Sequence, residues 1–182
     1  MIFLGQVDTV RYGTRRANPL RWVVVVCILA LVLAGCSRGQ TEIKPPEIRY
    51  GEDKCSDCDM IISEPRFAAA AMHDVGGGTY ESLLFDDIGD LLRYMKENPD
   101  LKYVASYVHD YDTEAWVDAS KAIYVLSSEI RTPMASGLAA SDTQTKAEAL
   151  ATQFNGTVMD WTTLQERAPA PRPGMHQGQM NK

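Results

Sequence analysis

The chain has 182 residues, of which 45% are hydrophobic and 8% aromatic, a composition typical of a folded protein rather than a disordered one. Its formal net charge is −6. An acidic chain without a stripe of basic and aromatic residues is poorly suited to phosphate backbones, so we exclude nucleic acid as a partner.

The first 35 residues have the features of a lipoprotein export signal. Trp22 to Ala34 is an unbroken apolar run that follows four arginines, and it is shorter than the roughly 20 residues that a membrane-spanning helix needs. The run ends in Leu33-Ala34-Gly35-Cys36, which resembles the box at which bacterial lipoproteins are cleaved and lipidated. We therefore predict that residues 1–35 are removed and that Cys36 anchors the protein to a membrane, facing the periplasm or the cell exterior.

The predicted mature protein is strongly acidic and keeps two candidate thiols. Removal of residues 1–35 leaves 14 basic and 23 acidic residues, a net charge of −9. Cys27 leaves with the signal, and Cys36 is predicted to carry the lipid. The remaining cysteines are Cys55 and Cys58. Such a closely spaced pair outside the cytoplasm indicates a small disulfide, a redox couple or a metal site.

Composition divides the rest of the chain into a tether, a domain and a tail. Residues 36–50 are polar, contain two prolines and are predicted to be a tether. Residues 51–167 are predicted to fold, and residues 168–182, rich in Pro, Gly and Gln, are predicted to be disordered. The stretch from Asp53 to Met60 has no helical or alternating apolar pattern, so we place it on a loop.

The first half of the domain, about residues 51–110, has the pattern of two strands, a helix and a third strand. An apolar stripe at helical spacing marks the helix: Ile88, Leu91, Leu92 and Met95. The helix is expected to begin after Asp86 or Asp87 and to end at Asn98-Pro99. The strands are expected at 66–73, 79–85 and 102–109, with Gly76, Gly77 and Gly78 turning the first two into a hairpin.

The second half, about residues 111–167, has a similar order of elements. The expected elements are strands at 113–118 and 122–127, residues 137–140 leading into an Asp142 cap, a helix at about 143–154, and a strand at 157–161. Two tandem ββαβ units in an α+β fold are the simplest interpretation.

Cys55, Cys58 and Met60 place three sulfur side chains within six residues. Thiolates and thioethers select Cu(I), whereas zinc normally takes four Cys, His or carboxylate ligands and does not use methionine. The cluster therefore predicts a Cu(I) site on a loop. Its acidic neighbours disfavour a free thiolate, which a redox or nucleophilic cysteine would need.

Further candidate ligands are Met134, Met72 and His73. Met72 and His73 are neighbours in a predicted strand and point to opposite faces, so at most one of them readily joins a shared site. Met134 is predicted to lie in a loop, from which its thioether either faces the cluster or fills the core. No catalytic set of nucleophile, base and acid is present, so we predict that the protein is not an enzyme.

Two other functions stay open at this point. A thiol-disulfide oxidoreductase would use Cys55 and Cys58 as a redox pair and would place Cys55 at a helix N-terminus. A metal-free adaptor lipoprotein would keep the two cysteines buried and permanently bridged.

The sequence combines four motifs: the lipobox, Cys55-x-x-Cys58-x-Met60, Trp116-Val117-Asp118-Ala119 with Lys121-Ala122-x-Tyr124-Val125, and Thr132-Pro133-Met134-x-Ser136-Gly137. In this combination they resemble those of the NosL family, whose members are copper-binding lipoproteins and accessory proteins of nitrous oxide reductase. The resemblance covers about residues 36–165. Asp59 stands where the family commonly has glycine.

The resemblance implies a fold similar to that of organomercurial lyase and a metallochaperone that delivers Cu(I) for assembly of the copper centres of nitrous oxide reductase in denitrification. It implies an ABC-type copper/sulfur maturation complex as a further partner. It also implies Cys55, Cys58 and Met60 as the metal motif. The lyase completes its cysteine pair with a carboxylate, and no counterpart of that carboxylate is identified in this sequence.

Overall fold

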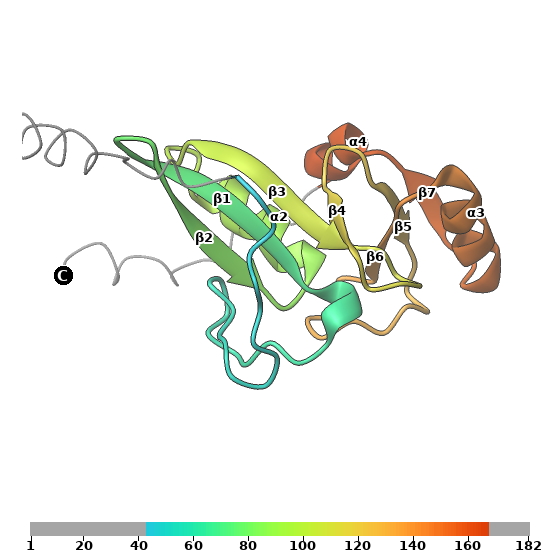
Figure 1. The fold of residues 1–182 in the computed structure, drawn as a ribbon. Coiled ribbons are helices and arrows are strands. Elements are labelled where there is room, and N and C mark those ends of the chain that lie inside the picture. The colour runs from blue at the N-terminus through green and yellow to red at the C-terminus, as the bar shows by residue number, and fades with distance from the viewer. Residues whose placement is uncertain (1–42, 168–182) are drawn as a thin grey trace, which may run out of the picture. The chain divides into compact units, whose positions relative to one another are not determined.

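Two antiparallel sheets form the framework of residues 43–167, the part of the chain that the computed structural model describes (Figure 1). The predicted signal, the first part of the tether and the predicted tail lie outside the described residues. Between residues 43 and 167, no helix combines the length and apolar character that crossing a bilayer requires.

The first sheet has four strands in the order β2-β1-β3-β4. Their bounds are β1 Ala69–Gly76, β2 Thr79–Phe85, β3 Tyr103–His109 and β4 Trp116–Asp118. A short 3-10 helix, η1 (Pro65–Phe67), precedes β1. Gly76, Gly77 and Gly78 all have positive φ angles and turn β1 into β2, which confirms the predicted hairpin.

Helix α2, Ile88–Glu97, follows β2 and buries Ile88, Leu91 and Leu92 of its predicted apolar stripe, with Met95 partly buried against the core. Asp87 is its N-cap, because the Asp87 carboxylate accepts a hydrogen bond of 2.7 Å from the Gly89 N–H. Asn98 is the C-cap, as predicted. The same helix also buries a carboxylate and a guanidinium, which belong to the site described below.

The second sheet has the order β6-β5-β7 and carries the two remaining helices. The bounds of these elements are β5 Ile123–Leu126, β6 Leu138–Ser141, α3 Gln144–Gln153, β7 Thr157–Met159 and α4 Trp161–Glu166. The order β5-β6-α3-β7 repeats β1-β2-α2-β3, so each half contains one ββαβ unit.

The prediction was wrong about which strands build the second unit. Residues 116–118, placed there by the prediction, form β4, which pairs with β3 and extends the first sheet. The partner of β5 is β6, at residues predicted only to lead into a helix cap. Alternation identifies extended segments but does not reveal which segment pairs with which.

The start of α3 and the presence of α4 also differ from the prediction. Thr143 rather than Asp142 caps α3. The Asp142 carboxylate instead pairs with Lys146 at 2.9 Å, and the Asp142 N–H donates to the buried Asp110 carboxylate at 3.0 Å. The last predicted strand is shorter than expected, because Asp160 caps α4.

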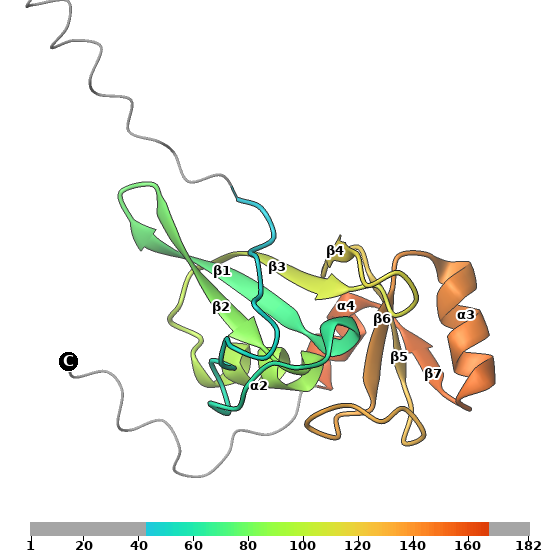
Figure 2. The same ribbon diagram turned by 60° about the horizontal axis from the view of Figure 1, so that its bottom comes forward.

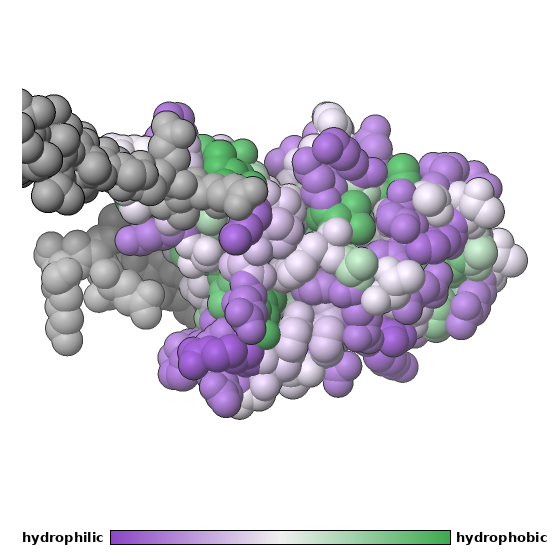
Figure 3. Space-filling model, in the orientation of Figure 1, coloured by the Kyte–Doolittle hydropathy of each residue, from purple (hydrophilic) through white to green (hydrophobic). Residues whose placement is uncertain are grey.

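The larger core cluster contains Cys55 of the predicted metal loop and Ile62, which follows that loop in the sequence. Cys55 and Ile62 are 2% and 0% exposed and pack in the same cluster as Phe85, Ile88 and Tyr124. Figure 2 shows the loop, in teal, beside α2. In Figure 3 the visible surface of the described residues is mainly hydrophilic, with small separate apolar spots. The loop is therefore part of the folded core, although Met60 and Ile61 are exposed at its outer side.

Replacing Gly137 by alanine should lower the free energy of unfolding. Gly137 has a φ of +68°, and a Cβ there would lie 2.3 Å from the Ser127 carbonyl oxygen. Gly77 is a matched control, since its φ is +66° and a Cβ there meets nothing within 4 Å. We expect Gly77→Ala to cost about 1–2 kcal/mol for the backbone alone, and Gly137→Ala to cost about 1–3 kcal/mol more.

The measurement is urea unfolding of the two variants beside the unmodified protein. Equal losses in the two variants would show that residue 137 does not approach residue 127 as described.

Candidate metal centre

The cysteines lie on a folded loop that is held together by hydrogen bonds between its own backbone groups. The Gly51 N–H donates to the Ile62 carbonyl, and the Ile62 N–H donates to the Asp53 carbonyl, each at 2.9 Å. Inside this narrow ribbon the Cys55 N–H donates to the Met60 carbonyl at 2.8 Å. Asp59 has a φ of +63°, the left-handed conformation that glycine most often adopts. The tight turn therefore forms with aspartate at this position.

The loop is also bonded to the edge of the first sheet. The Ser56 N–H donates to the Leu84 carbonyl at 2.7 Å, and the Leu84 N–H donates to the Ser56 hydroxyl at 3.1 Å. The Ser63 N–H donates to the Asp86 carboxylate at 3.2 Å. Since Ser56 stands directly after Cys55, the end of strand β2 fixes the position of the first thiol.

Cys55, Cys58 and Asp90 converge on one point. Their two Sγ atoms and one carboxylate oxygen all lie within 4.8 Å of one another. The Cys55 thiol donates to Asp90 Oδ2 at 3.4 Å, and the two cysteines are not bridged. Cys55 and Asp90 are buried, whereas Cys58 is half-buried. This group of three side chains is named the CCD cluster below.

Asp90 is the candidate site residue that the sequence did not reveal. It lies 35 positions after Cys55, in the first turn of α2, and is fully buried. Its neighbours Leu91 and Leu92 belong to the apolar stripe that marked the helix. At 100° per residue, however, Asp90 lies on the face of the helix opposite that stripe, where the sequence predicts exposure, so no local signal marked it as buried.

Arg93 is the charged partner of the CCD cluster. Its Nε donates to Asp57 Oδ2 at 3.1 Å, and its Nη2 contacts the carboxylates of both Asp57 and Asp90. These three side chains are 10%, 1% and 0% exposed, so the ion pairs are shielded from water. Acidic residues thus surround the cysteines, as the sequence indicated, but one buried cation offsets part of that charge.

Burial is the main cause of the protonation pattern in the cluster. It raises the pKa of the Cys55 thiol strongly and raises the pKa of Cys58 as well. It also raises the pKa of Asp90, against the opposing effect of the Arg93 guanidinium. Free thiolates are therefore disfavoured, and a cation that binds here must displace protons.

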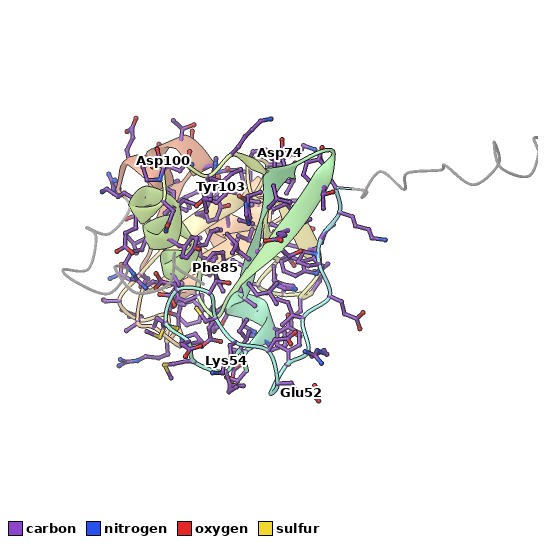
Figure 4. The ribbon with its side chains drawn as sticks, turned by 90° about the vertical axis from the view of Figure 1, so that its left-hand side faces the viewer. Glu52, Lys54, Asp74, Phe85, Asp100 and Tyr103 are labelled. Carbon is purple, nitrogen blue, oxygen red and sulfur yellow. The ribbon has the colours of Figure 1, made fainter. Side chains whose placement is uncertain are left out.

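Met60 lies on the same turn as the cysteines but faces outward. It is 54% exposed, in contrast to Cys55. In Figure 4, Lys54 and Glu52 lie at the outer tip of this loop. Met60 is therefore an exposed residue of the loop that carries the two thiols.

Met134 is fixed near the start of α2. Its N–H donates to Asp87 Oδ2 at 3.1 Å, and the Thr132 hydroxyl donates to the same oxygen at 2.6 Å. The helix turn that carries Asp90 is thus tied to the Thr132–Gly137 motif through the cap residue.

Met72 and His73 have partners within the first sheet. The Ser82 hydroxyl donates to the Met72 Sδ at 3.3 Å, and His73 pairs with Glu81 at 3.7 Å. His73 is not part of the CCD cluster. Asp74, its neighbour in sequence, lies at the end of the molecule away from Lys54 in Figure 4.

Neither rival function matches the geometry of the cysteines. Cys55 stands on a loop and not at a helix N-terminus, where a thioredoxin-like pair would begin. The two thiols are free, so they do not form the permanent bridge that a metal-free adaptor would use.

Cys58 should react with iodoacetamide faster than Cys55 in the folded, metal-free protein. The physical reason is exposure, since Cys55 is 2% exposed and Cys58 is half-buried. Peptide mass spectrometry over a time course measures the two rates, with the urea-unfolded protein as the control in which both residues react alike. Faster labelling of Cys55 would contradict the described loop.

Metal affinity should rise steeply with pH. Both thiol pKa values are raised by burial, so at neutral pH each thiol that becomes a ligand releases a proton. Two displaced protons give an increase of up to about 100-fold in apparent affinity for each pH unit, and Cys58→Ser should reduce this to about tenfold. Chelator competition at several pH values measures the slope. An affinity that does not change with pH would contradict protonated resting thiols.

Comparison with known proteins agrees with this fold and identifies the family. The copper-binding lipoprotein NosL of Stutzerimonas stutzeri is 28% identical over 169 residues, which cover 84% of this chain and 87% of that protein. The crystal structure of the copper chaperone NosL from Shewanella denitrificans matches with a TM-score of 0.57 at 19% identity, over 65% of this chain and 93% of the other, which supports the fold. The sequence profile named NosL matches residues 48–168. Because this match covers more than half of the sequence, the chain belongs to the NosL family.

Proposed function

We propose that this protein is a metallochaperone that holds Cu(I) between Cys55 and Cys58 and passes it to a partner protein. The observation that carries the proposal is the CCD cluster, in which two unbridged thiols and a carboxylate lie within 4.8 Å of one another. Thiolates are soft donors and select Cu(I). The role is binding and delivery, without catalysis.

Met60 is the proposed outer ligand. Its side chain is exposed on the loop that carries the buried and half-buried thiols, and its carbonyl accepts from the Cys55 N–H, so an ion would pass between inner and outer sulfurs by exchanging one ligand at a time. Met134 is a second supplement, since its backbone is bonded beside the first turn of α2. Met72 and His73 are weaker supplements, because each has a partner on β2.

Relatives support the same cargo for this chain. The Stutzerimonas stutzeri protein is named as copper-binding and as a lipoprotein, and the Shewanella denitrificans protein as a copper chaperone. We propose that this protein delivers copper for the copper centres of nitrous oxide reductase and works with an ABC-type copper/sulfur maturation complex.

The proposed location is outside the cytoplasm, on a membrane. Residues 1–35 would direct export, Cys36 would carry the lipid, and the first part of residues 36–50 would hold the domain away from the membrane surface. Ile48, at the end of that predicted tether, is buried in the core, so the folded domain begins before residue 51. The lipobox at Cys36 and the lipoprotein name of the relative support this arrangement.

Asp90 makes zinc a stronger competitor than the sequence suggested. Zinc accepts both cysteine and carboxylate ligands, and the CCD cluster supplies three of the four ligands that it normally takes. Binding experiments on this protein should therefore include both metals.

Removing either thiol should abolish tight Cu(I) binding. We expect Cys55→Ser and Cys58→Ser to weaken Cu(I) affinity by about 100-fold or more, beyond the effect typical of groups around a metal ligand. Met60→Leu should cost about tenfold, because it removes only the outer sulfur. Titration of the reduced protein with Cu(I) against a competing chelator measures these affinities.

Met159→Leu is the matched control, since it removes a buried thioether on β7 of the second sheet that is not a proposed ligand. It should bind Cu(I) as the unmodified protein does. Equally weak Cu(I) retention in all five proteins, the unmodified one included, would end the chaperone proposal. Insulin reduction by the metal-free protein would favour the oxidoreductase instead.

A further inference from the structure

Arg93 is a buried cation that joins the metal loop to helix α2. Its side chain is 10% exposed and contacts the carboxylates of Asp57 and Asp90, which are 1% and 0% exposed. Asp57 stands between the two cysteines, and Asp90 faces them from the helix. The guanidinium of Arg93 therefore makes two contacts. One is with Asp57, on the loop between the two cysteines, and the other is with Asp90, on the helix that faces them.

Asp90 is bound at both of its carboxylate oxygens. Its Oδ1 accepts from Arg93 Nη2, and its Oδ2 accepts from the Cys55 thiol at 3.4 Å. Arg93 follows Asp90 by three positions, so the two side chains are neighbours on one face of α2. When a hydrogen bond holds one oxygen of a carboxylate, the direction of the other oxygen is fixed as well. Here Oδ2 is fixed towards the sulfurs.

The planar fork of arginine suits this double contact. Arg93 bonds Asp57 through Nε at 3.1 Å and reaches both carboxylates through Nη2. Lysine carries the same charge but has a single nitrogen on a flexible chain, so it lacks the fixed geometry that orients two carboxylates at once.

We propose that Arg93 is a positioning residue that sets the metal preference of the centre by directing Asp90 Oδ2 at the space between the thiols. This inference rests on the proposed metal-binding function. Cu(I) is held chiefly by sulfur, whereas a borderline divalent ion such as Zn²⁺ gains more from a carboxylate oxygen. Arg93 therefore contributes more to the affinity for Zn²⁺ than to the affinity for Cu(I).

The test is a double-mutant cycle on metal affinity. Arg93→Met, Asp90→Asn and the double variant are titrated with Zn²⁺ and with Cu(I) in competition with chelators. We expect Arg93→Met to weaken Zn²⁺ binding by about 10–100-fold, as loss of a group that orients a ligand does, and to weaken Cu(I) binding several-fold less. In the double variant, Zn²⁺ should bind within about twofold of the affinity of Asp90→Asn, because Arg93 acts through Asp90.

Arg66→Met is the matched control, since Arg66 pairs with Glu114 at 3.2 Å and lies over the Tyr111 ring, outside the CCD cluster. It should leave both affinities unchanged. If Arg93→Met does not fold, Arg93→Lys replaces it in the test. Arg93→Lys should again lose more affinity for Zn²⁺ than for Cu(I). Equal losses for the two metals, or losses that multiply in the double variant, would overturn the proposal. An unmodified protein that binds neither metal would contradict the proposed function instead.

Discussion

The candidate metal centre depends on the packing of the cysteine loop against helix α2. Cys55 and Ile62 are buried in the core, Ser56 is bonded to strand β2, and Arg93 holds Asp57 from the helix. The loop is therefore fixed by the folded domain at several points and is not a free segment. Two sulfurs and a carboxylate are brought together before any ion binds, which lowers the ordering cost of binding.

Burial gives the centre two sides of different character. On the inner side Cys55 and Asp90 are buried, and burial raises the pKa of both groups. On the outer side Cys58 is half-buried, and the Met60 side chain is exposed. A structural metal is normally enclosed by four ligands. A site with an inner pair of donors and an accessible outer sulfur suits an ion that is taken up and given away.

Local patterns predicted the elements better than their pairing. Three adjacent glycines specified the hairpin, and an apolar stripe specified α2, because both signals lie within a few residues. The partner of β5 was misassigned, since a short extended segment carries no mark of its neighbour. Asp90 stayed hidden for the same reason: its chemistry depends on Cys55, 35 positions away, and only the packed fold brings the two together.

The central claim is that one copper ion lies between Cys55, Cys58 and Asp90. Anomalous scattering at the copper absorption edge, from crystals of the Cu(I)-loaded protein, tests it most directly. The account predicts a peak bonded to both Sγ atoms and faced by the Asp90 carboxylate. A peak at Met72 and His73, or at any position that neither cysteine reaches, would contradict it.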